Sequence, residues 1–190
     1  MKKSKEETIK TRQRIIDVAA TEFRRNGIIA SGIAELMALA GLTNGGFYRH
    51  FKSKDELIAE ASKACLNERA CELRLMSKGK TNSNRLTALA AIYLSKDHRD
   101  NPQKGCLLSA LGSELVRTNS ETRKIATQGF LEMVNMFAEQ FSDLKSTEAR
   151  KKAILAVSTM VGALTLARIV VDKDLSDSIL DVAANSIKKM

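Results

Sequence analysis

The sequence predicts an all-α protein. Its 190 residues contain one proline, Pro102, and the alternation of apolar and polar residues that indicates half-buried strands is almost absent. Apolar residues instead recur four positions apart, as Ile15, Ala19 and Phe23 do, which places them on one face of a helix. A chain of this length allows a small module packed on a larger core, so we expect two unequal helical parts.

The first helix is expected to end at Asn26 and Gly27, a pair that favours helix termination. Ser31 is placed to cap a second helix over residues 32–40. Gly41 then ends this helix in a tight turn.

Two further capping signals follow. Thr43 is expected to cap a third, very short helix over residues 43–49. Ser53 and Glu56 have the spacing of a capping box, in which each side chain accepts from the other residue's backbone N–H. A long fourth helix is expected from there to about Met76.

The remaining helices are predicted from the same apolar spacing. Residues 79–84 are polar and turn-like, and His98 to Lys104 is expected to be a loop around the proline. Helices are expected over residues 86–94, 105–117, 120–141, 147–171 and 176–187.

Targeting and membrane segments are not expected. The longest apolar stretch, Ala153–Ala167, contains three hydroxyl residues and is shorter than the roughly 20 residues of a membrane span. The basic segment Met1–Glu7 is not followed by an apolar core, so it does not resemble a secretory signal. These features predict a cytoplasmic protein with no membrane partner.

The cysteine and histidine content argues against metal and cofactor chemistry. Cys65, Cys71 and Cys106 are an odd number without a close pair, which disfavours a disulfide scaffold and a zinc site. With only His50 and His98, the chain contains no convincing metal cluster or catalytic triad. We therefore expect no metal, no cofactor and no enzymatic activity.

Positive charge is concentrated in two short segments. The net charge is +9, and residues 1–14 carry six Lys/Arg against two Glu. Residues 43–54 add Arg49, Lys52 and Lys54 without an acid. These segments are the candidate electrostatic footprint for a nucleic acid, although a solvated tail and turn would have the same composition.

The helices over 32–40 and 43–49, joined by a glycine-bearing turn, match a helix-turn-helix. The second helix of this motif lies in the DNA major groove with its N-terminal residues at the base edges. Asparagine pairs with adenine there, and threonine contacts a base or a thymine methyl group. Each of two adjacent glycines destabilises a helix by about 1 kcal/mol relative to alanine. Close approach of the backbone to DNA would explain why they are present, and the alternative is that they mark a loop. The base-reading residues are then Thr43, Asn44, Gly45 and Gly46.

The flanking side chains suit the phosphate backbone. Phe47 and Phe51 lie four apart and are expected to face inward, which leaves their polar neighbours free. Hydroxyl and basic groups beside a recognition helix commonly contact phosphate oxygens, although His50 is equally suited to packing. The full candidate DNA-binding set is Ser31, Thr43, Asn44, Gly45, Gly46, Tyr48, Arg49, His50 and Lys54.

The segment from Ala40 to Lys54, AGLTNGGFYRHFKSK, resembles the signature of the TetR family of bacterial regulators. Later segments resemble one subgroup of it, namely HRDNP at 98–102, GC at 105–106, AL at 110–111, VGAL at 161–164 and LAR at 166–168. The subgroup often has His where Asn44 stands and Pro where Leu107 stands. The first difference leaves the operator sequence open, and the second the start of the sixth helix.

The resemblance implies a TetR-like fold, with a three-helix DNA-binding head over 1–54 and a six-helix ligand-binding and dimerisation domain over 55–190. It also implies a homodimer and positions at Thr43, Tyr48 and Lys54 that commonly contact DNA. The expected function is a ligand-responsive regulator of transcription, a repressor released from a palindromic operator by an unidentified small-molecule inducer.

Two other classes are less consistent with the sequence. His98–Asp100 is similar to the kinase catalytic loop, but that loop needs an Asn where this chain has Gly105, and no glycine-rich phosphate loop is found. If the protein were an architectural DNA binder without a ligand, roughly two-thirds of the chain would have no function. DNA binding without turnover, and a ligand-induced change in DNA affinity, would separate these classes.

The large apolar side chains of the larger part can be interpreted as the lining of a cavity for a ligand. The same side chains lie at helical spacing, so they describe a packed core equally well. The candidate pocket residues are Tyr93, Leu94, Cys106, Leu107, Phe130, Met133, Met136 and Phe137.

The last two helices are expected to form an intersubunit four-helix bundle, because their apolar faces need a partner. The alternative is that these faces pack only within the subunit. The candidate interface residues are Ala153, Val157, Met160, Val161 and Leu164 on one helix and Ile179, Val182 and Ala183 on the other.

A thiol-based redox or electrophile sensor acting through Cys106 is the alternative function. Cys106 follows Gly105 at a predicted helix start, where exposed N–H groups favour the thiolate. Arg168 could approach from a later helix. The alternative is that Cys106 packs as a small buried hydrophobic residue, which is how cysteine ordinarily behaves.

Overall fold

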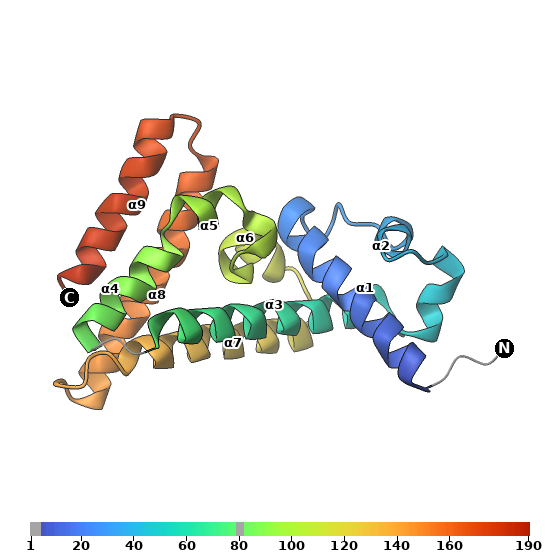
Figure 1. Ribbon diagram of the computed structural model, residues 1–190, viewed down its shortest axis with the longest axis horizontal. Coiled ribbons are helices and arrows are strands. Elements are labelled where there is room, and N and C mark those ends of the chain that lie inside the picture. Colours follow the sequence, from blue (N-terminus) through green and yellow to red (C-terminus); the bar gives the residue numbers. More distant parts are fainter. Residues whose placement is uncertain (1–4, 79–81) are drawn as a thin grey trace.

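The computed structural model describes residues 5–78 and 82–190, which form helices joined by short turns (Figure 1). No strand occurs within these two ranges, so the all-α prediction is confirmed. The elements are α1 (Lys5–Asn26), α2 (Ile33–Leu39), the 3-10 helix η1 (Asn44–Arg49), α3 (Lys54–Ser77), α4 (Asn82–Tyr93), α5 (Lys96–Asp100), the 3-10 helix η2 (Pro102–Lys104), α6 (Leu107–Leu115), α7 (Ser120–Ala138), α8 (Ser146–Ile169) and α9 (Lys173–Lys188).

The first core lies in the N-terminal part of the molecule (Figure 1). There α1, α2 and η1 surround buried aromatic side chains. Phe47 and Phe51 are buried with their ring centroids 5.5 Å apart, which confirms their predicted inward orientation. Apolar residues of α3 and α6 belong to the same core, including Leu57 and Leu111. The head is therefore packed directly on two helices of the larger part.

The second core is formed by the C-terminal half of α3 together with α4, α7, α8 and α9. Figure 1 shows α3 and α7 running along the length of the molecule, with α4, α8 and α9 at the far end. Tyr93, Phe137, Val157 and Leu164 are completely buried here. α8 has the length and apolar composition of a membrane span, which core helices of soluble proteins also have.

The predicted loop over His98–Lys104 is wrong, because this segment contains α5 and η2. The Ser95 hydroxyl accepts from the backbone N–H of His98 at 3.1 Å and so starts α5. Pro102 occupies the first position of η2, where its missing N–H costs nothing. The spacing of apolar residues did not indicate α5. The sequence signal for this helix is the serine cap at Ser95.

Other boundaries differ by a few residues. α4 begins at Asn82, inside the predicted turn over 79–84, of which residues 79–81 lie outside the described residues. α7 ends at Ala138 rather than residue 141. α9 begins three residues earlier than predicted, because the Asp172 carboxylate accepts from Leu175 N at 2.8 Å.

Neither Ser31 nor Thr43 makes the predicted capping hydrogen bond. Ser31 does not cap α2, since Gly32 takes that position and the Ser31 hydroxyl donates to Gly27 O at 2.7 Å. Thr43 precedes η1 without a side-chain cap bond, and η1 is a 3-10 helix rather than an α-helix.

The capping box of α3 is also half confirmed. The Ser53 hydroxyl accepts from Glu56 N at 3.2 Å, as predicted. The Glu56 carboxylate accepts from Lys52 N at 2.6 Å and not from Ser53 N.

Candidate nucleic-acid interface and its connection to the helical domain

The surface of η1 separates inward apolar rings from outward polar groups. Phe47 is 0% exposed, whereas its neighbour Tyr48 is 73% exposed and stands edge-on to it at 5.2 Å. Thr43, Asn44 and Arg49 are exposed as well. The sequence-predicted recognition residues therefore lie together on one solvent-facing segment.

The paired glycines of η1 are not required by the fold itself. A Cβ atom on Gly45 would meet nothing within 4 Å, and one on Gly46 would make an ordinary 3.5 Å contact with Met37. Neither glycine has a positive φ, unlike Gly41, whose φ of 67° forms the turn before η1. The open backbone at Gly45 is accessible to an external partner, so close approach to DNA stays a prediction.

Three other candidate contacts have roles within the protein. Ser31 is buried, so its predicted place on the DNA-facing surface is contradicted. His50 is half-buried, and its carbonyl accepts from Arg12 Nε at 3.1 Å. Lys54 donates to Ile28 O at 2.8 Å, which ties the start of α3 to the loop between α1 and α2.

Arg12 reduces the expected basic footprint of the N-terminus. Its guanidinium lies 4.5 Å from the centre of the Phe51 ring and donates to Glu60 and Glu56. The hydrogen bond to Glu60 raises the pKa of Arg12. This arginine holds α1 against α3 and is not free for phosphate, while residues 1–4 of the predicted footprint lie outside the described residues.

A carboxylate from α6 holds the loop that leads into α2. Glu114 Oε2 accepts from the backbone N–H groups of Ile28 and Ile29 at 2.8 and 3.0 Å. Gly27 begins this loop with φ of 89°, and a Cβ atom there would lie 2.7 Å from Glu114 Oε1. Sequence reasoning missed Glu114, because no local pattern relates a helix residue to backbone groups 85 positions away.

A second link joins α1 to the turn before α6. Arg24 is buried and donates through Nη1 to Gly105 O at 3.0 Å and through Nη2 to Glu68 at 3.2 Å. The head is therefore attached to the helical domain through α6 and through the turn that contains Gly105.

The predicted pocket residues pack as core. Tyr93, Cys106 and Phe137 are completely buried, and Phe130 is half-buried against the same cluster. Leu107 belongs to the core of the head. The described residues instead form an open groove of about 1320 Å³ where α3 and α7 adjoin the head.

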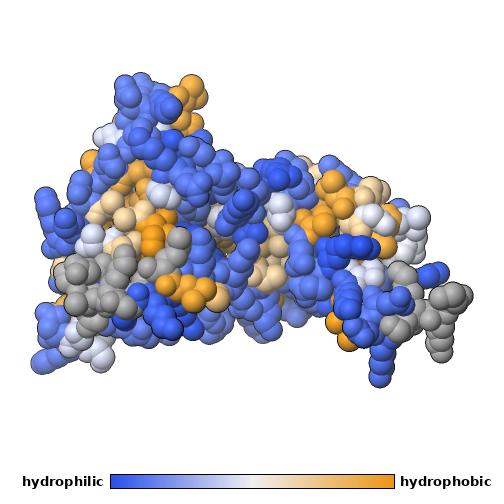
Figure 2. All heavy atoms as spheres, viewed as in Figure 1, coloured by the Kyte–Doolittle hydropathy of each residue, from blue (hydrophilic) through white to orange (hydrophobic). Residues whose placement is uncertain are grey.

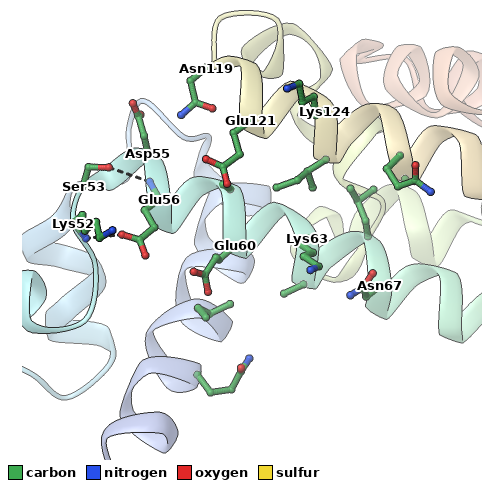
Figure 3. A pocket seen from close by; sticks show the side chains of 18 of the residues that line it. Lys52, Ser53, Asp55, Glu56, Glu60, Lys63, Asn67, Asn119, Glu121 and Lys124 are labelled. Carbon is green, nitrogen blue, oxygen red and sulfur yellow. Dashed lines mark hydrogen bonds between the residues drawn. The ribbon is translucent and has the colours of Figure 1, made fainter.

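Figure 3 shows that this groove is lined mostly by polar and charged side chains, many of them from α3 and α7. Glu60 and Lys63 of α3 lie across from Glu121 and Lys124 of α7. The groove is thus polar and does not match the apolar cavity that was expected.

The predicted dimer face is wrong for most of its residues. Ala153, Val157, Met160, Leu164 and Ala183 are buried within the subunit. Val161 and Ile179 are half-buried, and Val182 alone of the predicted set is exposed. The large exposed apolar residues of this region lie on other faces of α8, in the turn after it and on α9, namely Ile154, Leu155, Leu166, Ile169, Val171, Leu175 and Val182.

Figure 2 shows hydrophobic side chains at the end of the molecule where α8 joins α9. Leu166 is 54% exposed and Ile169 is 68% exposed. Gly162, on the same helix, has open space where a Cβ would lie, so another backbone could approach closely there.

The three cysteines differ in accessibility. Cys106 lies at the start of α6, as predicted, but as its N-cap residue, since α6 begins at Leu107 rather than residue 105, and it is completely buried. Cys65 is buried as well, and burial raises the pKa of its thiol to about 11. Cys71, on the other side of the same helix, is the exposed thiol. Arg168 does approach the turn before Cys106: Nη2 would lie 3.1 Å from a Cβ on Gly105, and it donates to His98 O of α5 at 2.6 Å.

Two short helices joined by a glycine turn, with polar residues exposed on the second, have the arrangement of a helix-turn-helix motif. Residues 15–61 match the family described as "Bacterial regulatory proteins, tetR family". Residues 80–182 match "Transcriptional regulator LmrA/YxaF-like, C-terminal domain". The chain belongs to the TetR family of bacterial regulatory proteins.

Two curated relatives are similar to this chain over fewer than 60 residues. The chain is 41% identical over 59 residues to the transcriptional regulator AcrR of Shigella flexneri, covering 31% of this chain and 27% of that protein. It is 38% identical over 58 residues to the transcriptional regulator TtgR of Pseudomonas putida, covering 30% and 28%. The matched segment spans only about a quarter of the length of these relatives.

Solved structures support the fold over nearly the whole chain. The reduced form of E. coli NemR superimposes with a TM-score of 0.82 at 19% identity, covering 95% of this chain and 96% of that one. A TetR-family regulator from Cytophaga hutchinsonii gives 0.83 at 21% identity, covering 100% and 98%.

Proposed function

We propose that this chain is a ligand-responsive DNA-binding regulator of transcription, a repressor that a small molecule releases from a palindromic operator. The observation that carries the proposal is the exposed segment from Thr43 to Arg49 within a TetR-family head. A cytoplasmic site of action and DNA binding without catalytic turnover accompany this proposal. The thiol-sensing alternative gains no support, because Cys106 is buried.

Within the proposed interface, Thr43 and Asn44 read base edges and Tyr48, Arg49 and Lys54 bind phosphate oxygens. Lys54 uses one of its three donors on Ile28 O, so the same ammonium can position the loop and meet a phosphate. The operator is expected to contain two half-sites roughly 34 Å apart or a little more.

Substitutions at this surface are expected to separate affinity from specificity. Tyr48→Phe and Lys54→Ala should weaken binding to all sequences, and loss of Lys54 should reduce the salt slope by about one. Asn44→Ala should change the preferred sequence instead, because it removes a base contact. Selection from random DNA followed by binding at several salt concentrations measures both effects.

Lys63→Ala provides the matched control, since Lys63 is exposed on α3 but lies in the groove rather than on η1. It should leave both affinity and preference unchanged. Selection that enriches no palindrome with the unmodified protein would refute the proposed function.

The proposed homodimer uses the exposed faces of α8 and α9. Leu166→Glu is expected to give a monomer, because it places a charge in an apolar interface. Leu164→Glu is the contrasting variant: Leu164 is completely buried within the subunit, so this change should destabilise the fold itself. Sedimentation at micromolar concentration and thermal unfolding distinguish the two outcomes. A folded Leu166→Glu protein that remains dimeric would contradict this interface.

A further inference from the structure

A group of buried polar side chains lies where α3, α4, α5, α6 and α8 meet. Arg69 of α3 and His98 of α5 are each 5% exposed, and Tyr93 at the end of α4 is 0% exposed. The guanidinium carbon of Arg69 lies 5.5 Å from the centre of the Tyr93 ring. Arg168 of α8 donates to the backbone carbonyl of His98 at 2.6 Å.

The hydrogen bonds of His98 determine its tautomer. Nε2 lies 2.9 Å from the backbone nitrogen of Cys106 and must accept from its N–H, so the ring proton is on Nδ1. Nδ1 then donates to Tyr93 O at 2.6 Å. Arg69 Nη2 lies 3.3 Å from this same Nδ1, but two donors face each other there and no hydrogen bond forms.

Arg69 consequently has one edge without an acceptor. Its Nη1 pairs with Glu72, which is partly exposed, but Nε has no hydrogen-bond partner among the described residues. The buried hydroxyl of Tyr93 lies near the side chains of Cys106 and Ser109, but neither meets the geometry of a hydrogen bond with it. Buried polar groups are normally hydrogen-bonded, and each one that is not destabilises the folded chain.

Arg168 adds a second positive charge. Within the described ranges, no carboxylate lies within hydrogen-bonding distance of its guanidinium group. Its hydrogen-bond partners are the carbonyls of His98 and Arg99 and the hydroxyl of Ser109. Burial lowers the pKa of Arg168. The cluster therefore combines two buried guanidinium groups, one open guanidinium edge and one unpartnered phenol.

We propose that Arg69, Arg168 and Tyr93 form a binding site for the carboxylate of a small organic acid, the effector of the regulator proposed above. The Nε–Nη2 edge of a guanidinium matches the two oxygens of a carboxylate. The Tyr93 hydroxyl supplies a third donor, and Arg168 supplies the second positive charge. This inference rests on the proposed function only for the role of the acid as an effector.

The site adjoins a direct link to the DNA-binding head. A Cβ atom on Gly105 would lie 2.7 Å from His98 and 3.1 Å from Arg168, so this turn is packed closely against the cluster. Gly105 O accepts from Arg24 of α1. An acid that draws Arg168 from its carbonyl partners would shift this turn and thereby move α1.

The test is titration calorimetry of the full chain, without DNA, with acetate and benzoate and with the matched amides acetamide and benzamide at constant ionic strength. We expect the acids to bind at millimolar concentration and the amides not to bind. Tyr93→Phe and Arg69→Met should weaken acid binding at least tenfold. Arg123→Met, exposed on α7, should bind as the unmodified protein does.

Tyr93→Phe keeps the test decisive, because it removes a hydroxyl that has no partner and so should not unfold the chain. Absence of acid binding, or equal binding by the unmodified protein, Arg69→Met and Tyr93→Phe, would overturn the site. Acid binding without any selected DNA palindrome would refute the proposed function and leave the site standing. Acid binding with no change in operator affinity would remove the effector role.

Discussion

At about pH 3.5 the protein is expected to have lost about 4 kcal/mol of its folding free energy through His98 alone. Burial, with repulsion from Arg69 and Arg168, lowers the pKa of His98 to about 3. Protonation of Nε2 would also break its hydrogen bond with Cys106 N. The folded state therefore keeps His98 neutral.

The sign follows from the two pKa values. The pKa in the folded chain is below the ordinary value of 6.5, so below that pH the unfolded chain binds a proton that the folded chain does not. The contribution of His98 is complete above pH 6.5 and is lost as the pH falls towards 3. Denaturant unfolding at a series of pH values measures this loss.

His98→Gln is the informative variant, because its amide can accept from Cys106 N and donate to Tyr93 O without titrating. Acidic residues also contribute to acid unfolding, so the quantity to compare is the difference between the pH profiles of the two proteins. Gln128→Ala, exposed on α7, removes no titrating group, so it is the control and should keep the original slope. Parallel profiles for the unmodified protein and His98→Gln would contradict this expectation.

Removal of the Glu114 carboxylate is expected to cost about 2–3 kcal/mol, since charged acceptors contribute more than neutral ones. Glu114→Ala leaves the N–H groups of Ile28 and Ile29 without their acceptor. Glu114→Gln keeps a neutral acceptor and should cost about half as much. Chemical denaturation measures both, and operator affinity should fall in the same order because this loop leads into α2.

Gly27 supplies an internal check on this contact. Gly27→Ala should be destabilising twice over, because φ is 89° and the new Cβ would lie 2.7 Å from Glu114 Oε1. In the Glu114→Ala background only the backbone strain remains, so the cost of Gly27→Ala should be smaller. Strictly additive costs would show that the two residues do not interact. The control variant is Glu121→Ala, exposed on α7, which should change stability very little.

The head was predictable because its signals are local. The spacing of Phe47 and Phe51, the cap at Ser53 and the glycine turn at Gly41 each act within a few residues. The resulting segment is exposed at Tyr48 and buried at Phe47, as expected. Ser31 was misassigned, because its hydroxyl bonds back to Gly27 rather than forward to α2, and the predicted caps at Thr43 and Glu56 differ in their hydrogen bonds.

The inward face of α8 could not be predicted in the same way. Apolar residues occur around most of this helix, including Leu155 and Leu166 outside and Val157 and Leu164 inside. Periodicity distinguishes faces only where one of them is polar. The packing of α7 and α9 therefore decides which face remains for a second subunit.

The sequence by itself determined the all-α class, the helix-turn-helix and the outward residues of η1, because helix spacing, caps and turns act over short distances. Tertiary structure alone decided that Glu114 holds the head loop, that Cys106 is buried, and that Arg69 and Tyr93 lie beside His98. These contacts join residues far apart in the chain, and hydrogen-bond geometry and burial depend on how helices pack rather than on the pattern within any one of them.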